Sequence, residues 1–227
     1  SRRLLRSWRP RDGQRALRIG PVDGAGVEIE ISAPGTAQGP SAWSADGKTL
    51  LVNRFGDRSD DDFGMLPLQE GGKFQPLVET AGQDGGAQFS PDGRWIAYYS
   101  DGSGSQEIYV IPFPGPGPRL QVSTSGGGQV RWSADGREIY FVETGTGDAH
   151  LAAVAVQESG GSLRIGSPHT VYRGWLGGHP ARPTYDVHPD GKRLLAIKRE
   201  PQDAGRDTSH VVLIFGWLEE LNRKIQE

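Results

Sequence analysis

A six-residue pattern that recurs four times constrains the fold of this sequence more than any other feature. It reads aromatic, Ser, Ala or Pro, Asp, Gly and a basic residue, as in WSADGK, FSPDGR and WSADGR, with VHPDGK as a variant. The glycines of the four copies stand at positions 47, 93, 136 and 191, which are 46, 43 and 55 residues apart. A period of roughly 40–45 residues indicates one four-stranded antiparallel sheet per repeat.

The pattern also predicts a hairpin turn. In a three-residue hairpin loop, a type I turn is followed by a residue in the left-handed region, which glycine adopts at low cost. The Ser or His before the turn can hydrogen-bond the backbone amides of the turn, and proline suits the next position because its φ is fixed. We therefore predict a structural rather than a catalytic role for the turn residues Asp46, Gly47, Asp92, Gly93, Asp135, Gly136, Asp190 and Gly191.

Each turn is followed by a short apolar segment, a polar loop, a third strand and an outer strand. The segments after the turns, KTLLVNR, RWIAYYS, REIYFVE and KRLLAIKR, are rich in β-forming residues. The prediction is an all-β protein, a β-propeller of four-stranded antiparallel blades with about five blade units. As a single domain over 1–227, it would comprise a partial blade at 1–35, blades at 36–80, 81–124 and 125–173, and a last blade with a short C-terminal helix at 174–227.

The first 35 residues allow two interpretations. The run WRPRDG could be a degraded repeat turn with one inserted residue. Alternatively RRLLRSW, RALRIGPVDG and VEIEIS are the second, third and outer strands of a blade, and we prefer this because VDGAG then falls on a turn. At the other end, WLEELNRKIQE places its apolar residues on one helical face and is expected to cap the propeller.

Composition excludes several classes of protein. The net charge of −3 argues against a nucleic-acid binder, although seven arginines among the first eighteen residues leave a phosphate-binding arm as an alternative to an exposed strand face. The absence of cysteine excludes disulfides, thiolate zinc sites and thiol nucleophiles.

The longest apolar run, HVVLIFGWL, is far below the ~18–20 residues of a membrane helix, so no membrane insertion by this segment is expected. We also expect no signal peptide, because nothing apolar follows the N-terminal arginines.

The chain resembles the TolB-like propellers, which carry WD-type repeats. The segments that carry the resemblance are FSPDGRWIAYYSDGSGSQEIYVIPFPGPG, WSADGREIYFV, YDVHPDGKRLLAIKRE and the ending HVVLIFGWLEELNRK. It is most similar to the C-terminal propeller of bacterial proteins that begin with a serine/threonine kinase or winged-helix domain. The resemblance implies a portion of a larger propeller, with closure of five units as the alternative, and favours an extracytoplasmic over a cytoplasmic location. One departure is FGMLPLQEGG, whose low apolar density predicts a distorted blade near Phe63.

Motifs for catalysis are not found in the sequence. The G-x-S-x-G motif of α/β-hydrolases does not occur, and Gly102–Ser105 is interpreted as a loop between two strands. The five histidines show no metal-ligand spacing, and we predict no cofactor. The loop GDRSDDDFG offers Asp57, Asp60 and Asp62 to calcium, but it lacks the glycine and distal glutamate of a calcium loop and is more simply a solvated acidic loop.

One face of the propeller is the remaining candidate for function. Loops from second to third strands and from outer strands to the next blade share this face, and they are acidic and Gly-rich in places. Trp175 is either a binding anchor or a cover for the side of its own blade. The candidate partner-binding residues are Asp60, Asp61, Asp62, Trp175, His179 and Arg182.

The expected function is a non-enzymatic module that binds or senses a protein or peptide, such as a cell-envelope component. One alternative is an accessory propeller that gates a prolyl-oligopeptidase-like hydrolase, against which the ending WLEELNRKIQE argues because no hydrolase segment follows it. Another is a small-ligand-binding propeller, or a carbohydrate-processing or lactone-cleaving propeller with a central metal. The metal would need acidic or His ligands on the inner strands, which GQVRWSA and GAQFSPD do not offer.

Overall fold

The computed structural model of the chain is built from β-strands. The residues that the structure describes form nineteen strands in five antiparallel sheets and contain no helix. The predicted C-terminal helix lies outside these residues. The structure describes residues 3–8, 16–21, 29–31, 38–55, 61–69, 72–145, 147–174, 183–199 and 209–215.

The sheets follow one another in chain order, each made of consecutive strands. The first contains β1 (Arg3–Trp8), β2 (Ala16–Pro21) and β3 (Ile29–Glu30). The second contains β4 (Gln38–Trp43), β5 (Thr49–Arg54), β6 (Asp62–Pro67) and β7 (Gln75–Val78). The third contains β8 (Asp84–Phe89), β9 (Trp95–Ser100), β10 (Glu107–Pro112) and β11 (Leu120–Gln121). The fourth contains β12 (Gly128–Trp132), β13 (Glu138–Glu143), β14 (His150–Ser159), β15 (Ser162–Ile165) and β16 (His169–Arg173), and the fifth β17 (Tyr185–Val187), β18 (Arg193–Arg199) and β19 (Ser209–Phe215).

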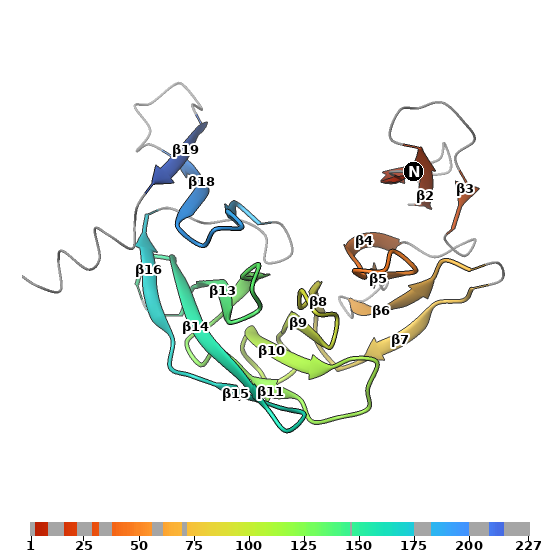
Figure 1. Cartoon of the computed structure of the whole chain (residues 1–227), viewed down its shortest axis with the longest axis horizontal. Helices are drawn as coiled ribbons and strands as arrows, with labels where there is room; N and C mark the ends of the chain where they lie inside the picture. Colours follow the sequence, from red (N-terminus) through yellow and green to blue (C-terminus); the bar gives the residue numbers. More distant parts are fainter. Residues whose placement is uncertain are drawn as a thin grey trace, which may run out of the picture.

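Together the sheets form an arc, as in part of a propeller (Figure 1). Strands β4 and β8 lie on the inner side of the arc, and β7 and β11 lie on the outer side. The sheets β1–β3 and β17–β19 stand at its two ends, across an open side. This is the all-β propeller arrangement that the repeat predicts.

The hydrophobic core lies between neighbouring sheets. All six residues of β9 are buried, because the sheet packs on both of its faces. Between the third and fourth sheets, Tyr99, Ile108 and Val110 meet Ile139 and Phe141 in one cluster. Similar clusters join the first sheet to the second, the second to the third, and the fourth to the fifth. A middle sheet buried on both faces requires continuous apolar strands, which explains sequences such as WIAYYS.

The four Asp-Gly turns join β4 to β5, β8 to β9, β12 to β13 and β17 to β18. In the first of them, the Ser44 hydroxyl donates to Asp46 Oδ1 at 2.6 Å and accepts from the Thr49 amide at 3.0 Å, while the Lys48 amide donates to the same Asp46 oxygen at 3.0 Å. The second and third turns repeat these bonds. The four glycines have φ between 67° and 72°, in the left-handed region that disfavours side chains.

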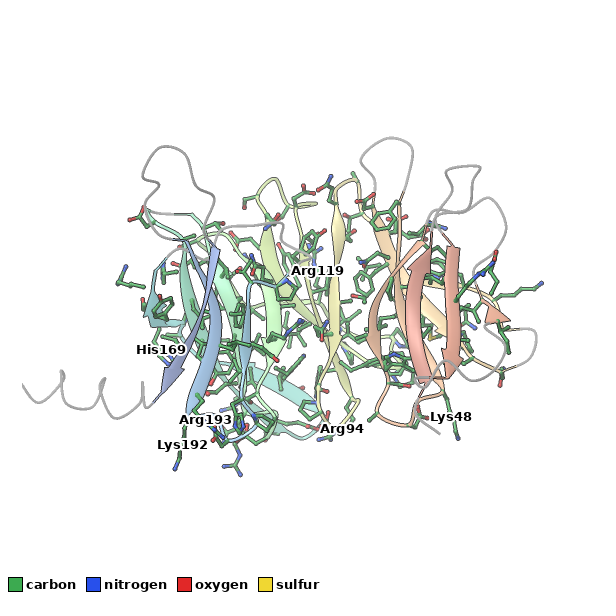
Figure 2. All side chains as sticks on the ribbon, turned by 90° about the horizontal axis from the view of Figure 1, so that it is seen from above. Lys48, Arg94, Arg119, His169, Lys192 and Arg193 are labelled. Atoms are coloured by element: carbon green, nitrogen blue, oxygen red, sulfur yellow. The ribbon has the colours of Figure 1, made fainter. Side chains whose placement is uncertain are left out.

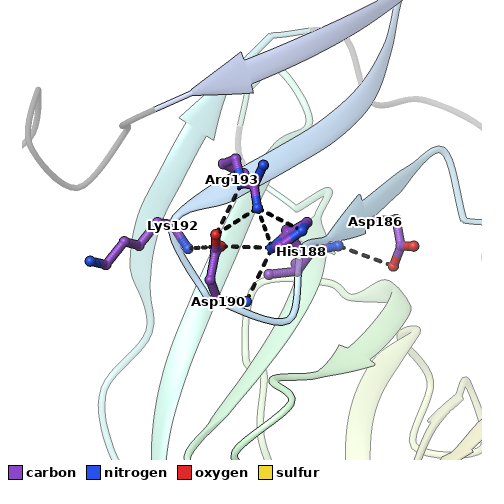
Figure 3. Close-up of polar contacts among 6 residues, drawn as sticks. Asp186, His188, Asp190, Lys192 and Arg193 are labelled. Atoms are coloured by element: carbon purple, nitrogen blue, oxygen red, sulfur yellow. Dashed lines mark hydrogen bonds and ion pairs between the residues drawn. The ribbon is translucent and has the colours of Figure 1, made fainter.

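His188 replaces the serine in the fourth turn, and an arginine completes the network (Figure 3). The Asp190 amide donates to His188 Nδ1 at 3.2 Å, and the Lys192 amide donates to Asp190 Oδ1 at 2.9 Å. Arg193 Nε donates to Asp190 Oδ2 at 3.0 Å. The Lys192 amide, His188 and Arg193 together lower the pKa of Asp190 to about 2, because each stabilises the ionised carboxyl.

Two outer segments differ from a regular blade. Strand β14 is ten residues long, and its second half pairs with β15 while its first half pairs with β16. Near Phe63, where the sequence predicts a distortion, strand β6 is regular, but its pairing with β7 shifts register between Phe63 and Gly64. A Cβ on Gly64 would lie 2.3 Å from the Gln75 carbonyl oxygen, so only glycine allows β7 this close.

A bulge recurs where the inner strands of the second, third and fourth sheets pair with the next strand. At the bulge of β12, Gln129 has a φ of 55°, which is unusual for a side-chain-bearing residue. The Gln129 side-chain oxygen accepts from the Thr184 amide at 2.7 Å, and the Gln129 carbonyl accepts from the Tyr185 hydroxyl at 2.7 Å. The bulge thereby turns polar groups of one inner strand towards the next sheet and joins the two.

Candidate binding surface

The antiparallel strand order places two sets of connections on opposite faces of the arc. The Asp-Gly turns share one face, the turn face, and Figure 2 shows Lys48, Arg94, Lys192 and Arg193 along that edge. The loops from second to third strands, and from outer strands to the next inner strand, share the other face. We call this the loop face. In the described part of the chain it comprises residues 55, 61, 79–83, 101–106, 122–127, 144–145, 147–149, 174 and 183–184.

Arg54 connects two loops of the loop face. Its guanidinium donates to Asp62 Oδ2 at 2.8 Å and to Glu79 Oε1 at 3.0 Å, and it lies 5.2 Å from the centre of the Phe74 ring. These two carboxylates raise the pKa of Arg54, with the hydrogen bond to Asp62 as the largest cause. Asp62, a predicted binding residue, is only 9% exposed, and its carboxylate is already paired with Arg54 within the protein.

Glu107 occupies in the third sheet the register position that Asp62 has in the second. Each begins the third strand of its sheet and lies opposite the last residue of the second strand. Glu107 is 4% exposed, and its carboxylate accepts from the Ser123 hydroxyl and from the Gly126 amide at 3.1 Å. It therefore fixes the loop from β11 to β12.

Asp84, at the start of the inner strand β8, is fully buried. Its Oδ2 accepts from the Thr80 hydroxyl at 2.8 Å and from the Thr80 amide at 3.2 Å, and its own amide donates to the Asp61 carbonyl at 2.6 Å. Burial raises the pKa of Asp84 because desolvation disfavours the carboxylate, and this outweighs the hydrogen bonds that lower it.

Substitution of Asp84 by asparagine is expected to stabilise the protein at pH 7. A carboxyl whose pKa is raised by folding lowers stability once it ionises, so the stability of the wild type falls as pH rises from about 4 through the folded pKa. Asparagine keeps an acceptor for Thr80 and does not ionise. Urea unfolding should give a higher midpoint for Asp84→Asn at pH 7 and converging midpoints near pH 4. A lower midpoint at pH 7 would show that the carboxylate stabilises the fold.

Among the described residues of the loop face, the exposed charge is mainly negative. Besides the two carboxylates that Arg54 engages, the carboxylates of Asp61, Asp101, Glu143 and Asp148 lie in or beside its loops, and none of these four is fully buried. Asp101 Oδ1 accepts from the Gln83 amide at 2.6 Å, which leaves its second oxygen for solvent or a ligand. Against them, the described part of the face carries Arg173 and His150, the latter 3.7 Å from Glu143.

The other predicted binding residues are divided between the described and undescribed parts of the chain. Asp61 is the first described residue of its loop and is half-buried, next to Asp62. Asp57, Asp60, Trp175, His179 and Arg182 lie outside the described residues. Sequence reasoning did not single out Arg54, Asp84, Asp101 or Glu107, although the position of an acidic residue at the start of a third strand was a usable signal in two repeats.

Neither a metal cluster nor a membrane-spanning helix occurs within the described residues. No group of three or more His, Asp or Glu side chains is arranged to hold a metal ion there. Nor does that part of the chain contain a helix with the length and hydropathy needed to cross a bilayer.

Comparison with known proteins identifies structures that have a similar fold. No family model and no curated protein matches this sequence. Among solved structures, TolB from Acinetobacter baumannii is similar with a TM-score of 0.68 and 20% identity, over 89% of this chain and 46% of that one. A putative TolB from Agrobacterium tumefaciens has a TM-score of 0.58 and 21% identity, over 74% and 62%. An oligogalacturonate lyase in complex with manganese has a TM-score of 0.62 and 16% identity, over 89% and 55%.

The chain thus spans about half to three-fifths of the length of these neighbours. The neighbours include both TolB and enzymes, and at these identities the likeness concerns the fold and not the activity. The sheets, their order around the arc and these likenesses together show that the chain has the fold of a TolB-like β-propeller.

Proposed function

We propose that this chain is a non-catalytic module that binds a protein or peptide on the loop face. The observation that supports the proposal is the set of accessible carboxylates there, Asp61, Glu79, Asp101, Glu143 and Asp148. A surface with excess negative charge attracts and orients a basic segment of a partner. The candidate residues Asp60, Trp175, His179 and Arg182 belong to the same proposal.

Polar contacts that hold two of the described loops, 79–83 and 122–127, support recognition. Arg54 and Glu107 each hold a loop in place through two or more polar contacts, and the strands beneath are buried. Loops that are already ordered lose little conformational entropy when a partner binds. A larger bacterial protein, with a kinase or winged-helix domain ahead of the propeller, is the context we propose, on the basis of the sequence resemblance.

Neutralising two carboxylates of the loop face is expected to weaken binding of a basic peptide. The probe is a fluorescent peptide that alternates Lys with Ser and Gly, titrated by anisotropy. The variant Asp61→Asn/Asp101→Asn should bind at least tenfold more weakly, which corresponds to roughly 1.4 kcal/mol. The side-chain oxygen of the asparagine at position 101 would still accept from the Gln83 amide, so the loop should keep its shape.

The control variant is Glu30→Gln, which removes a partly exposed carboxylate on the outer strand β3. It should bind the basic peptide like the wild type, and wild-type affinity should fall as salt is raised. A peptide with Asp in place of Lys gives the decisive comparison. If the double variant bound the basic peptide like the wild type, or if it lost the same affinity for the peptide with Asp, the proposed function of this face would be wrong.

A further inference from the structure

The turn face holds a pocket of about 810 Å³ between the third and fourth sheets. It is bounded by two Asp-Gly turns, the one from β8 to β9 and the one from β12 to β13, and by the hairpin of β14 and β15. The pocket is on the face opposite the carboxylates described above, and the proposed function does not use it.

The β14–β15 hairpin forms one wall of the pocket. The third strands β6 and β10 have six residues, whereas β14 has ten, and its last four residues pair with β15 beyond the body of the sheet. Arg94, in the turn of the third sheet, forms an ion pair with Glu158 of the hairpin. A contact from one sheet to the next thus holds the hairpin against the pocket.

The walls of the pocket are largely apolar. Two indole rings line it, Trp95 from β9 and Trp132 from β12, together with Val156, Leu163 and Ile165 of the hairpin. Trp95 is 6% exposed, and Trp132 is partly buried. Aromatic side chains bury large apolar areas and are over-represented where proteins bind peptides. An apolar or aromatic side chain of a ligand therefore has a suitable environment here.

The charged groups at the pocket differ in how far they are already engaged. Arg94 is paired with both Asp92 and Glu158. Asp135 accepts from the Ser133 hydroxyl at 2.7 Å and from the Arg137 amide at 3.1 Å, which also lowers the pKa of its carboxyl, with the Ser133 bond as the main cause. The exposed guanidiniums of Arg137 and Arg164 make no hydrogen bond or ion pair with any described residue.

Two guanidiniums that have no hydrogen-bond or ion-pair partner among the described residues lie beside an apolar pocket, and they favour a ligand with carboxylates. Each guanidinium presents five N–H donors in a planar fork that matches a carboxylate. A ligand that suits both the apolar pocket and the two arginines carries carboxylates next to a large apolar side chain. An acidic peptide segment with interspersed aromatic residues has this composition.

The strand β15 adds a reason for an extended peptide. It pairs with β14 along one edge, and its other edge has no strand partner among the described residues. An open edge offers backbone N–H and C=O groups to an added strand. An extended segment can then place alternate side chains on the face of Leu163 and Ile165 and on the face of Arg164.

We infer that the pocket on the turn face binds an extended acidic, aromatic peptide segment of a partner protein. An aromatic side chain of the peptide packs against the apolar wall of the pocket, and its carboxylates are held by Arg137 at the turn and by Arg164, which lies on the face of β15 opposite Leu163 and Ile165. The protein would thus have two binding faces of opposite preference, with the loop face for basic segments and the turn face for acidic ones.

The probe for this site is a fluorescein-labelled peptide that alternates Asp and Phe, titrated by anisotropy. We expect saturable binding and at least a tenfold loss of affinity for Arg137→Ala/Arg164→Ala. Both side chains are exposed, so this variant should unfold like the wild type in urea. The matched control is Lys48→Ala, which changes the equivalent residue of the first turn, on the same face but outside the pocket.

Two further peptides separate the contributions of charge and of the aromatic ring. A peptide with Ala in place of Phe should bind at least tenfold more weakly than the Asp/Phe peptide, and one with Lys in place of Asp should not bind the pocket. Any one of three results would overturn the inference. The first is no binding up to about 1 mM Asp/Phe peptide, and the second is an equal loss of affinity in Lys48→Ala and in the arginine variant. The third is sedimentation showing that the pocket is covered by a second copy of the chain. None of these results bears on the loop face, which Asp61→Asn/Asp101→Asn tests separately.

Discussion

Substitution of Phe141 by alanine is expected to lower the free energy of unfolding by about 3–5 kcal/mol. Phe141 is fully buried in the middle strand β13 and packs in the cluster between the third and fourth sheets. Its ring contributes to the contact of these two sheets, with Tyr99 and Ile108 among the residues of the same cluster. Truncation leaves a cavity between sheets that cannot approach each other freely, since the inner strands on both sides are hydrogen-bonded to their own neighbours.

Chemical denaturation followed by tryptophan fluorescence measures this loss, because Trp95 and Trp132 belong to the same cluster. The control is Ile29→Ala, which truncates a side chain that is 58% exposed and should change stability by less than about 0.5 kcal/mol. A loss below about 1 kcal/mol for Phe141→Ala would mean that these sheets do not pack as the structure has them.

Substitution of Glu107 by alanine should cost about 2–4 kcal/mol, mainly because it leaves two of the three hydrogen-bond donors to its carboxylate without an acceptor. These donors are the buried Ser123 hydroxyl and the Gly126 amide, and the Ser123 hydroxyl in turn accepts from the Ile108 amide at 2.8 Å. Ser123 and Ile108 are both fully buried, so water does not readily replace the carboxylate at that point. The loop from β11 to β12 should open before the rest of the sheet unfolds.

Hydrogen exchange of the Gly126 amide reports this opening, and denaturation reports the global loss. Glu107→Gln is the matched control, because it keeps the chain length and one acceptor oxygen and should retain most of the stability. If Glu107→Ala and Glu107→Gln were equally stable, the carboxylate would not be the group that holds this loop.

The two faces of the arc differ in how far their acidic side chains are hydrogen-bonded within the protein. On the turn face, each of the four turn aspartates is hydrogen-bonded to its own turn, and the basic residue two positions on is exposed in every copy. On the described part of the loop face, Asp62 and Glu107 are engaged at equivalent positions, whereas Asp61, Asp101 and Asp148 keep accessible carboxylates. The opposite preferences of the two proposed binding surfaces follow from this difference.

From the sequence one could predict the type of the Asp-Gly turns, the number of sheets and the position of most strands. The reason is local: Asp hydrogen-bonds the amide two residues on, and Gly has positive φ at 47, 93, 136 and 191, whatever the rest of the chain does. The apolar segments after these turns became strands because a sheet buried on both faces needs them. The propeller therefore follows from features that lie within a few residues of one another.

Contacts between residues far apart in the chain decided the rest. Arg54 with Glu79, Arg94 with Glu158 and Gln129 with Thr184 are 25, 64 and 55 residues apart, and no periodicity in the sequence pairs them. The longer interval of 55 residues between Gly136 and Gly191 was a sign of an insertion, and the β14–β15 hairpin accounts for part of it. That the hairpin closes a pocket against the neighbouring turn depends on the angle between two sheets, which only the tertiary packing sets.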